Sequence, residues 1–597
     1  MKMVNVSRLV KPVFAALITF YALFTDAWGK VPVESMELSV LFIGITAFYY
    51  HHLGSCQKDR RIVAFSSFFS LCMVIGRAYD KKDTFFILLS GKHEILVSLL
   101  SFIGFFILFY VCLCQLEKAI MQVGLGNETQ QFTGKQKLKY AGIILMCWLP
   151  VLIAFFPGSV DHDSFAMLDF WIGYYHWTTH HPVVATVYLG MFMDFGKYLL
   201  HHVNAGVFLY ISIQTAFGLW VIMKMIELMR KLGTPRPGVY AALAFFALMP
   251  VWPGYMQCVI KDSMHFIFYM LYSVFLVEIL LEPHWIQQRK HWGLLLFAAL
   301  GMFSFRNTGI YLFVLTFIPL TIYLLHKSRA LWKPYVSVCT VVLVVHFAFA
   351  GILVPALGIK KGGVQEMLSI PFQQTARYVK YHPRDILPWE REAVNGVLPI
   401  DKIPKAYDSQ ISDPVKKFMI KEDGNSKLPA YFKAWFSMGL RHPGVYLDAL
   451  GSGTYDYFYP DGFSRARKTG LKLYIKDKHD KNSPNTGIYD VQYMQSESLR
   501  KKVTYYLTTF WREIPIMGLC FNTGVYTWIC MICAMLLLGK RKFSALLALL
   551  PSAVTLLFCI ASPVNGYVRY MLPIMATVPL MISWALYCLH HKKVKQT

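Results

Sequence analysis

Apolar stretches of about 20 residues recur along the whole chain, and short polar segments separate them. Each stretch is long enough to cross about 30 Å of hydrocarbon as a helix. The sequence does not show the alternating strands of about ten residues that a membrane β-barrel requires. The pattern therefore predicts an all-α polytopic membrane protein of the helical-bundle kind.

We expect about fourteen transmembrane helices in this chain. The first is expected to be retained, because no small-residue cleavage site follows it. Segment 180–202 is apolar but carries Asp194 and Lys197, so we expect it to lie on, or re-enter, the outer face. The predicted spans are 12–28, 38–52, 62–77, 95–115, 139–156, 205–229, 238–252, 264–281, 292–305, 309–326, 334–356, 514–538, 543–561 and 567–589.

The distribution of charged residues predicts the orientation of these spans in the membrane. The chain is 56% hydrophobic, and only 16% of its residues are charged, yet its formal net charge is +25. Lysine and arginine gather in short loops such as QKDRR (57–61) and GKQKLK (134–139), as well as at both ends of the chain. Because basic loops stay on the cytoplasmic side, both ends are predicted to be cytoplasmic. A membrane protein explains this positive charge, so no nucleic-acid partner is expected.

This topology divides the chain into five regions. The polar stretch 358–512 falls outside the cytoplasm and, with its mixed charges and many Tyr, Pro and Gly residues, is expected to fold as a mainly helical domain. The predicted regions are 1–156 with the first five spans, 157–204 with an external acidic loop and interfacial helices, 205–357 with six spans, the extracytoplasmic domain 358–512, and 513–597 with three spans and a basic tail.

The external acidic loop carries the first candidate chemistry. In FFPGSVDHDSF, Asp161 and Asp163 follow directly after a predicted span. A carboxylate at such a place can take a proton from an attacking hydroxyl, or can bind a divalent cation through oxygen. Either acid can instead cap the helix that begins near Ser164. Acids at i and i+2 point in different directions on a helix, so we expect one to face a site and the other to support it.

Two further polar pairs lie at the predicted outer face. His180 and His181 precede a proline, and suit phosphate binding, metal binding or capping of polar backbone at the interface. Lys261 and Asp262 lie just before an apolar span. Lys261 can contact a phosphate with Asp262 orienting it, or can serve as an interfacial anchor.

Two arginines complete the candidate set. Arg306 and Asn307 lie between two short apolar runs, and Arg569 stands beside tyrosines at the start of the last span. A guanidinium binds phosphate in a forked geometry, although Arg569 can also be an interfacial anchor. Polar groups that gather at a membrane interface are candidates for a functional site.

Other chemistries find little support. The 12 cysteines lie mostly in apolar spans, and none lies between Gly358 and Arg512, so no disulfide framework is predicted. Cys530 and Cys533 form a CxxC pair inside an apolar span, which favours buried packing over metal binding. No Walker A motif and no dinucleotide fingerprint is present.

The ordered segments DHDSF, HHPVV, FRNTGIY, SIPFQQTARYV and VRYMLPI, spread over about residues 150–575, resemble those of a group of bacterial cell-envelope membrane proteins. The acidic loop after a span also resembles that of the GT-C superfamily of membrane glycosyltransferases. The family's acids are often adjacent, whereas His162 separates them here. The metal requirement varies across that superfamily, so a divalent cation is possible and its ligands stay unknown.

The resemblance implies a function. The protein would sit in the bacterial cytoplasmic (plasma) membrane with its active site on the extracytoplasmic side. It would take a sugar from a polyprenyl-phosphate-linked donor and pass it to a wall polymer, a lipid-linked glycan or a protein. Asp161 or Asp163 would deprotonate the acceptor, while Arg306, Arg569 and Lys261 would hold the phosphate. The partners are thus membrane lipids, the lipid-linked donor and a glycan or protein acceptor.

Three alternatives remain open. A transporter or flippase of lipid-linked glycans would place polar groups along the midplane of several spans, whereas here they gather at one face. A polymerase or ligase of surface glycans would share the donor and the external site but transfer whole chains. An acyltransferase would want an intramembrane histidine, and His346 is one, although packing explains it as well.

Overall fold

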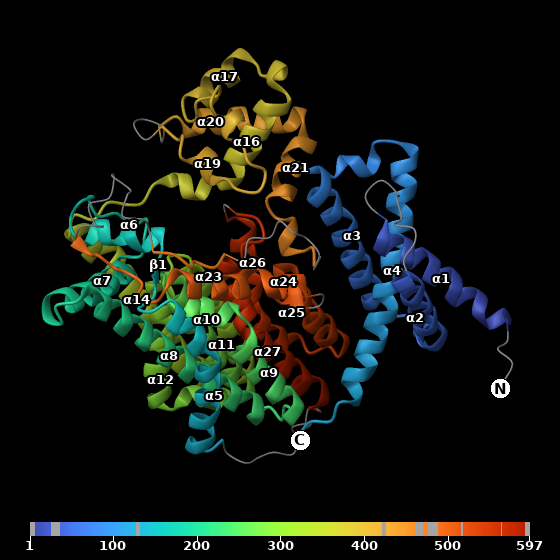
Figure 1. Cartoon of the computed structure of the whole chain (residues 1–597), viewed down its shortest axis with the longest axis horizontal. Helices are drawn as coiled ribbons and strands as arrows, with labels where there is room; N and C mark the ends of the chain where they lie inside the picture. The colour runs from blue at the N-terminus through green and yellow to red at the C-terminus, as the bar shows by residue number, and fades with distance from the viewer. Residues whose placement is uncertain are drawn as a thin grey trace.

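The computed structural model describes residues 6–25, 36–126, 132–420, 426–460, 470–475, 488–514, 517–562 and 564–591. Helices dominate these residues, and within them the regular sheet is limited to two strands of two residues each (Figure 1). Nine helical segments in the described residues are long and apolar enough to cross a membrane. The chain is therefore an all-α multi-pass membrane protein.

These nine segments are Arg60–Lys82 (α3), Lys92–Gln122 (α4), Gly134–Ala154 (α5), Val203–Lys231 (α8), Lys261–Leu281 (α11), Gly309–Lys327 (α13), Ala330–Ala356 (α14 to α15), Phe543–Ile560 (η11 and α26) and Val568–His590 (α27). The fourteen crossings predicted from the sequence are not confirmed. One reason is that two helices in the predicted spans are too short to cross a membrane. α12 (Arg289–Ser304) has 16 residues and α9 (Arg236–Leu248) has 13, so at 1.5 Å per residue both are shorter than about 30 Å of hydrocarbon.

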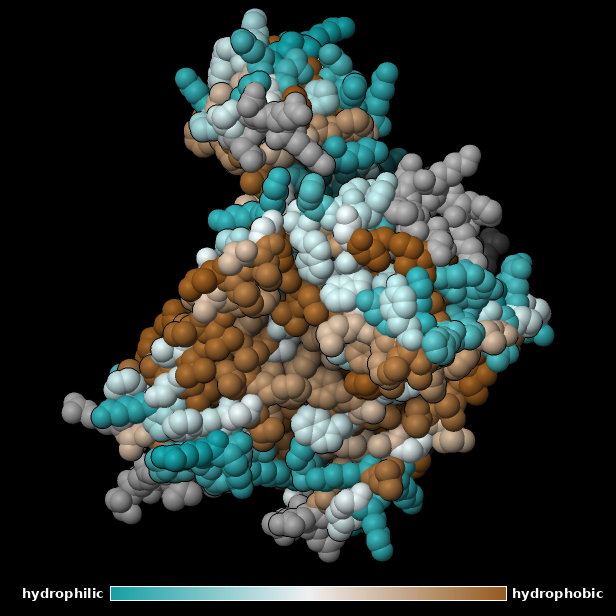
Figure 2. Space-filling model, turned by 90° about the vertical axis from the view of Figure 1, so that its left-hand side faces the viewer, coloured by the Kyte–Doolittle hydropathy of each residue, from teal (hydrophilic) through white to brown (hydrophobic). Residues whose placement is uncertain are grey.

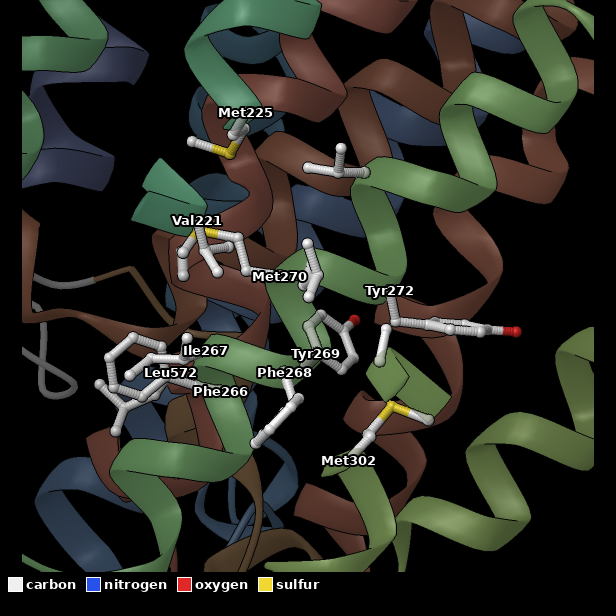
Figure 3. Packing of buried hydrophobic residues seen from close by; sticks show 14 of the residues in the cluster. Val221, Met225, Phe266, Ile267, Phe268, Tyr269, Met270, Tyr272, Met302 and Leu572 are labelled. Carbon is white, nitrogen blue, oxygen red and sulfur yellow. The ribbon is translucent and has the colours of Figure 1, made fainter. Parts of the chain in front are cut away.

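α11 lies at the centre of the bundle. Its apolar window is 89% buried, against 78% for α27 and 61% for α8. A helix that is apolar on all sides is suited to such a central place. Figure 3 shows side chains of α11 packed among residues of α8, α12 and α27, with Phe266 and Met270 from α11 itself and Leu572 from α27. The start of α11 is thus fixed by packing on every side.

Helices at the edge present apolar side chains outward. The segment Ala330–Ala356 is only 17% buried, and its exposed residues include Val344, Phe347 and Ile352. Figure 2 shows a broad hydrophobic band on one face of the molecule, between a hydrophilic upper part and a hydrophilic lower edge. Such a band is what a lipid-facing surface requires.

The acidic-loop region contains two short helices, α6 (His162–Trp171) and α7 (Val183–Asp194). α7 continues into a π-helical turn, Phe195–Leu199, before α8 begins. At 12 residues, α7 is about 18 Å long and too short to cross a bilayer. Asp194 at its end accepts hydrogen bonds from Trp171 Nε1 (2.9 Å) and from the Tyr489 hydroxyl (2.5 Å), which tie it to the rest of the molecule.

Residues 364–452 form a separate helical unit, which we call the cap. In its described part a hydrophobic core of its own holds it together, with Phe372, Tyr378 and Tyr431 fully buried. The cap forms the upper end of the molecule in the view of Figure 1. Its main helices are α16 (Ser369–Tyr381), α17 (Pro388–Asn395), α18 (Ile403–Ala406), α19 (Asp413–Lys416), α20 (Leu428–Arg441) and α21 (Pro443–Ser452).

The N-terminal helices α1 (Val6–Phe24), α2 (Met36–His52), α3 and α4 form a second group beside the main bundle (Figure 1). A buried arginine joins this group to the cap. Arg377 of α16 donates to Asp83 Oδ2 (3.0 Å) and to the Asp83 carbonyl (2.6 Å), at the end of α3. Asp448 of α21 accepts from the Thr84 hydroxyl (2.6 Å) and the Phe85 amide (3.1 Å). The cap is thus anchored by polar contacts to the end of α3.

Candidate functional site

A two-stranded parallel sheet brings the acidic loop to the start of α11. Strand β1 (Ser159–Val160) pairs with β2 (Cys258–Val259) in the register Ser159↔Cys258. The close approach depends on Gly158, whose φ is +144° and whose Cβ, if present, would lie 3.0 Å from the carbonyl of Gln257. Because the carboxyl ends of parallel strands meet at one edge, the helices that follow, α6 and α11, begin side by side.

The two strand–helix junctions have matching sequences. In the register of the sheet, SVDHDS (159–164) aligns with CVIKDS (258–263), so Asp163 corresponds to Asp262 and Ser164 to Ser263. Ser164 Oγ also donates to the carbonyl of Val259 (2.5 Å), which locks the two junctions together. The sequence analysis missed this repeat, although the shared pattern V-x-x-D-S could have revealed it.

Asp161 caps α6. Its Oδ1 accepts a hydrogen bond from the backbone N–H of Ser164 (3.0 Å), and Ser164 Oγ lies 3.0 Å from the same oxygen. The side chain is fully buried, and among the described residues its Oδ2 has no hydrogen-bond partner. Burial, together with the charge of neighbouring Asp163, raises the pKa of Asp161. The capping alternative therefore applies to Asp161.

Asp163 is partly exposed, with 30% of its side chain accessible. Its Oδ2 lies 2.5 Å from Arg569 Nη2 and 3.5 Å from Lys261 Nζ. Burial would raise the pKa of Asp163, but the charges of Lys261 and Arg569 outweigh it and hold that pKa well below its usual value. Of the two acids of the loop, Asp163 is thus the accessible one, and the neighbouring cations favour its ionised form.

Arg569, in the first turn of α27, binds both corresponding acids. Its Nη2 lies 2.6 Å from Asp262 Oδ2, and its Nε donates to the same oxygen at 2.7 Å. Arg306 Nη1 lies 3.3 Å from Asp262 Oδ1, and its guanidinium stands 4.8 Å from the centre of the Tyr570 ring. Asp262 is therefore held between two arginines.

Of the two histidines, His181 lies in the site and His180 lies at its edge. His181 is buried, and its Nδ1 lies 2.7 Å from Lys261 Nζ. Burial and the charge of Lys261 lower the pKa of His181 to about 2, so the ring is neutral and accepts from the ammonium. His180 is exposed, with its ring centre 4.6 Å from that of His181. Asn307 donates to the carbonyl of Thr179 (2.9 Å) and so supports this segment from outside the site.

A lysine that the sequence analysis did not single out joins the site. Lys472 lies in segment 470–475, which is held by hydrogen bonds from the Tyr255 hydroxyl to Gly470 O (2.9 Å) and from Gln257 Nε2 to Lys472 O (3.1 Å). Its charge acts to lower the pKa of Asp161. No local pattern marks Lys472, since it reaches the site from a distant polar region.

We call seven residues the charge cluster: Asp161, Asp163, Lys261, Asp262, Arg306, Lys472 and Arg569. With all of them ionised, four cations stand against three carboxylates, which leaves one net positive charge. Such an arrangement attracts an anion. It does not suit a divalent cation, because Asp163 and Asp262 already accept from Arg569, and a fully buried Asp161 offers one free oxygen.

Comparison with known proteins places most of the chain in one family. The family of unknown function DUF6020 matches residues 174–597, which include Lys261, Asp262, Arg306 and Arg569. Asp161 and Asp163 lie just before the matched region. No curated protein and no solved structure matches the chain. By this match the chain belongs to the family of unknown function DUF6020.

Proposed function

We propose that this protein is a membrane glycosyltransferase that takes a sugar from a polyprenyl-phosphate-linked donor. The acceptor is a cell-envelope glycan or protein, and the reaction takes place at the outer face of the bacterial cytoplasmic membrane. One observation carries the proposal. A partly exposed, ionised carboxylate, Asp163, lies against Lys261 and Arg569 at one end of a bundle of membrane-length helices.

The position of the charge cluster suits a lipid-linked anion. The lipid chain of such a donor stays in the hydrocarbon, and its phosphate lies at the interface. Lys261 and Arg569 stand at the first residues of α11 and α27, and so at the ends of two membrane-length helices. The cluster's excess of one cation favours a phosphate there, and the two helix N-termini add partial positive charge.

Asp163 is the proposed base. In the structure Lys261 and Arg569 hold its pKa low, which makes it a weak proton acceptor. A donor phosphate would compete for both cations and add a negative charge nearby, and each effect raises the pKa of Asp163. The base would therefore become effective when the donor is bound, as general-base catalysis requires.

The reaction follows from these placements. Asp163 accepts the proton of the acceptor hydroxyl, and the hydroxyl oxygen forms a bond to the anomeric carbon of the sugar. The bond between that carbon and the phosphate oxygen breaks, and the phosphate leaves with the electron pair as polyprenyl phosphate. Arg306, Lys261 and Arg569 stabilise the charge that develops on the phosphate, a task for preorganised cations.

Transfer of labelled sugar from polyprenyl-phosphate donors by purified protein in lipid nanodiscs tests the proposal. Wild type should transfer sugar, and Asp163→Asn should lose about 10²-fold or more of that rate while remaining folded. Asp161→Asn is the matched control, because Asn also caps helices and the Asp161 side chain is buried. Equal activity of Asp163→Asn and wild type would show that Asp163 is not the base. Movement of intact lipid-linked sugar across a bilayer without transfer would favour the transporter alternative.

A further inference from the structure

Three side chains with metal-ligating atoms meet on the cap, away from the charge cluster. Asp385 Oδ2 lies 3.3 Å from His382 Nδ1 and 3.0 Å from His442 Nε2. All three ligand atoms lie within 4.8 Å of one another. Among the described residues, this is the one group of three such side chains with that spacing.

Both histidines stand at equivalent corners of the backbone. α16 ends at Tyr381 and is followed by His382-Pro383, while α20 ends at Arg441 and is followed by His442-Pro443. The two histidines have nearly the same conformation, with φ of −130° in both and ψ of 50° and 67°. Two helix C-termini, each carrying partial negative charge, therefore end at this group, and such ends favour a cation.

Arg441 lies beside this group and is itself paired with a carboxylate. Arg441 donates from Nη1 to the carbonyl of Asp385 (2.5 Å), and its other nitrogen pairs with the buried carboxylate of Glu390. That pairing offsets the positive charge of Arg441. As metal ligands, two neutral imidazoles and one carboxylate would bring a single negative charge to a dication.

We propose that His382, Asp385 and His442 bind one divalent cation of the zinc type. Zinc bonds to His nitrogen and carboxylate oxygen are about 2.0–2.2 Å long in a tetrahedral arrangement, which places neighbouring ligand atoms about 3.3–3.5 Å apart. The two measured separations from Asp385 Oδ2, 3.0 and 3.3 Å, are close to that value. The centres of the two imidazole rings lie 4.0 Å apart, and the ring planes are inclined at 25°.

The fourth position of the ion has access to solvent. His382 and His442 both line a cavity of about 520 Å³ at the junction of the cap with the end of α3. Lys82, Arg377 and Arg441 also line it, so the ligand that completes the coordination is water or an anionic group. The ion would join the corner after α16 to the corner after α20, and so brace the cap. The proposal does not depend on glycosyl transfer.

Metal binding by purified full-length protein tests the proposal, with the chain first freed of metal by a chelator. Zn²⁺ alone should bind at one ion per chain and raise the midpoint of thermal unfolding. Co²⁺ alone should give the visible absorption of a four- or five-coordinate ion with nitrogen and oxygen ligands. His382→Gln and His442→Gln should each weaken Zn²⁺ binding about 100-fold or more. His284→Gln is the control, because His284 is exposed and its ring lies 3.1 Å from the side-chain oxygen of Gln287 in its own turn.

Three results would overturn the proposal. The first is wild-type protein that takes up no stoichiometric Zn²⁺ or Co²⁺. The second is a thiolate band in the Co²⁺ spectrum, which would move the ion to the cysteines. The third is an unfolding midpoint that responds to pH but not to Zn²⁺, as a purely hydrogen-bonded trio would. The wild-type Co²⁺ spectrum decides the matter even where a variant fails to fold.

Discussion

Asp163 and Asp262 occupy equivalent positions at the starts of α6 and α11, and the same nitrogen of Arg569 contacts both. Arg569 Nη2 lies 2.5 Å from Asp163 Oδ2 and 2.6 Å from Asp262 Oδ2. Two carboxylates brought this close repel one another unless a cation lies between them. The guanidinium therefore joins three helices that are far apart in sequence, and the site cannot keep its geometry without it.

We expect Arg569→Ala to lower the free energy of unfolding by about 3–5 kcal/mol, because it leaves the buried Asp262 without its closest cation. Arg569→Lys keeps the charge but loses the forked geometry of the guanidinium. Its free energy of unfolding should lie between those of Arg569→Ala and wild type. Denaturant unfolding in detergent micelles measures the difference. Arg391→Ala removes an exposed arginine and should change stability little. An Arg569→Ala protein as stable as wild type would show that the bridge contributes nothing.

The capping role of Asp161 makes a separate prediction. Asp161→Ala removes the acceptor for the Ser164 N–H and should destabilise the protein by about 1–2 kcal/mol, whereas Asp161→Asn should be close to wild type. Unfolding in detergent compares the three proteins. Equal stability of the Ala and Asn variants would mean that the hydrogen bond to Ser164 does not matter for α6.

His181 predicts a pH dependence. The pKa of its buried ring is about 2, far below the value of about 6.5 in an unfolded chain. Below pH 6.5 the unfolded state takes up a proton that the folded state does not. The free energy of unfolding therefore decreases as the pH is lowered, by up to about 1.4 kcal/mol per pH unit. In His181→Gln this contribution should disappear, and the unfolding midpoint should change less between pH 7 and pH 5. His284→Gln should keep the wild-type slope, and a His181→Gln protein with that same slope would refute the neutral ring.

The anchoring of the cap can be measured as a coupling energy. A double-mutant cycle of Arg377→Gln with Asp83→Asn should give about 1 kcal/mol or more, because Arg377 is buried although Asp83 is partly exposed. The exposed pair Arg391–Asp401, at 3.4 Å, is the matched control and should give a value near zero. Similar couplings for the two pairs would mean that the Arg377 contact does not hold the cap to α3.

The proposed orientation in the membrane is open to labelling in intact cells. Asp401 has 88% of its side chain exposed on the cap, and Lys540 is exposed at the end of α25 (Thr523–Gly539), in a loop predicted to be cytoplasmic. A membrane-impermeant maleimide should react with Asp401→Cys but not with Lys540→Cys, above the background of the native cysteines. The reverse labelling pattern would show that the cap and the charge cluster lie on the cytoplasmic side of the membrane.

Local patterns predicted the long helices well. The span predicted at 309–326 is α13 (Gly309–Lys327), and that at 567–589 is α27. These agree because apolar length and helix formation are both local properties. The strands β1 and β2 were not predicted, since two residues carry no periodic signal and their pairing joins distant segments. For the same reason the sequence gathered Asp163, Asp262 and Arg569 at one predicted surface without showing that they touch.

The short sheet also constrains the length of the chain between strand and helix. Each residue added to a helix turns it by about 100° and advances it by 1.5 Å. One residue inserted between Val160 and Asp161 would leave β1 paired with β2, yet would rotate α6 enough to carry Asp163 away from Arg569. One residue inserted between Val259 and Ile260 would displace Asp262 in the same way. These two junctions can therefore accept a change of side chain more easily than a change of length.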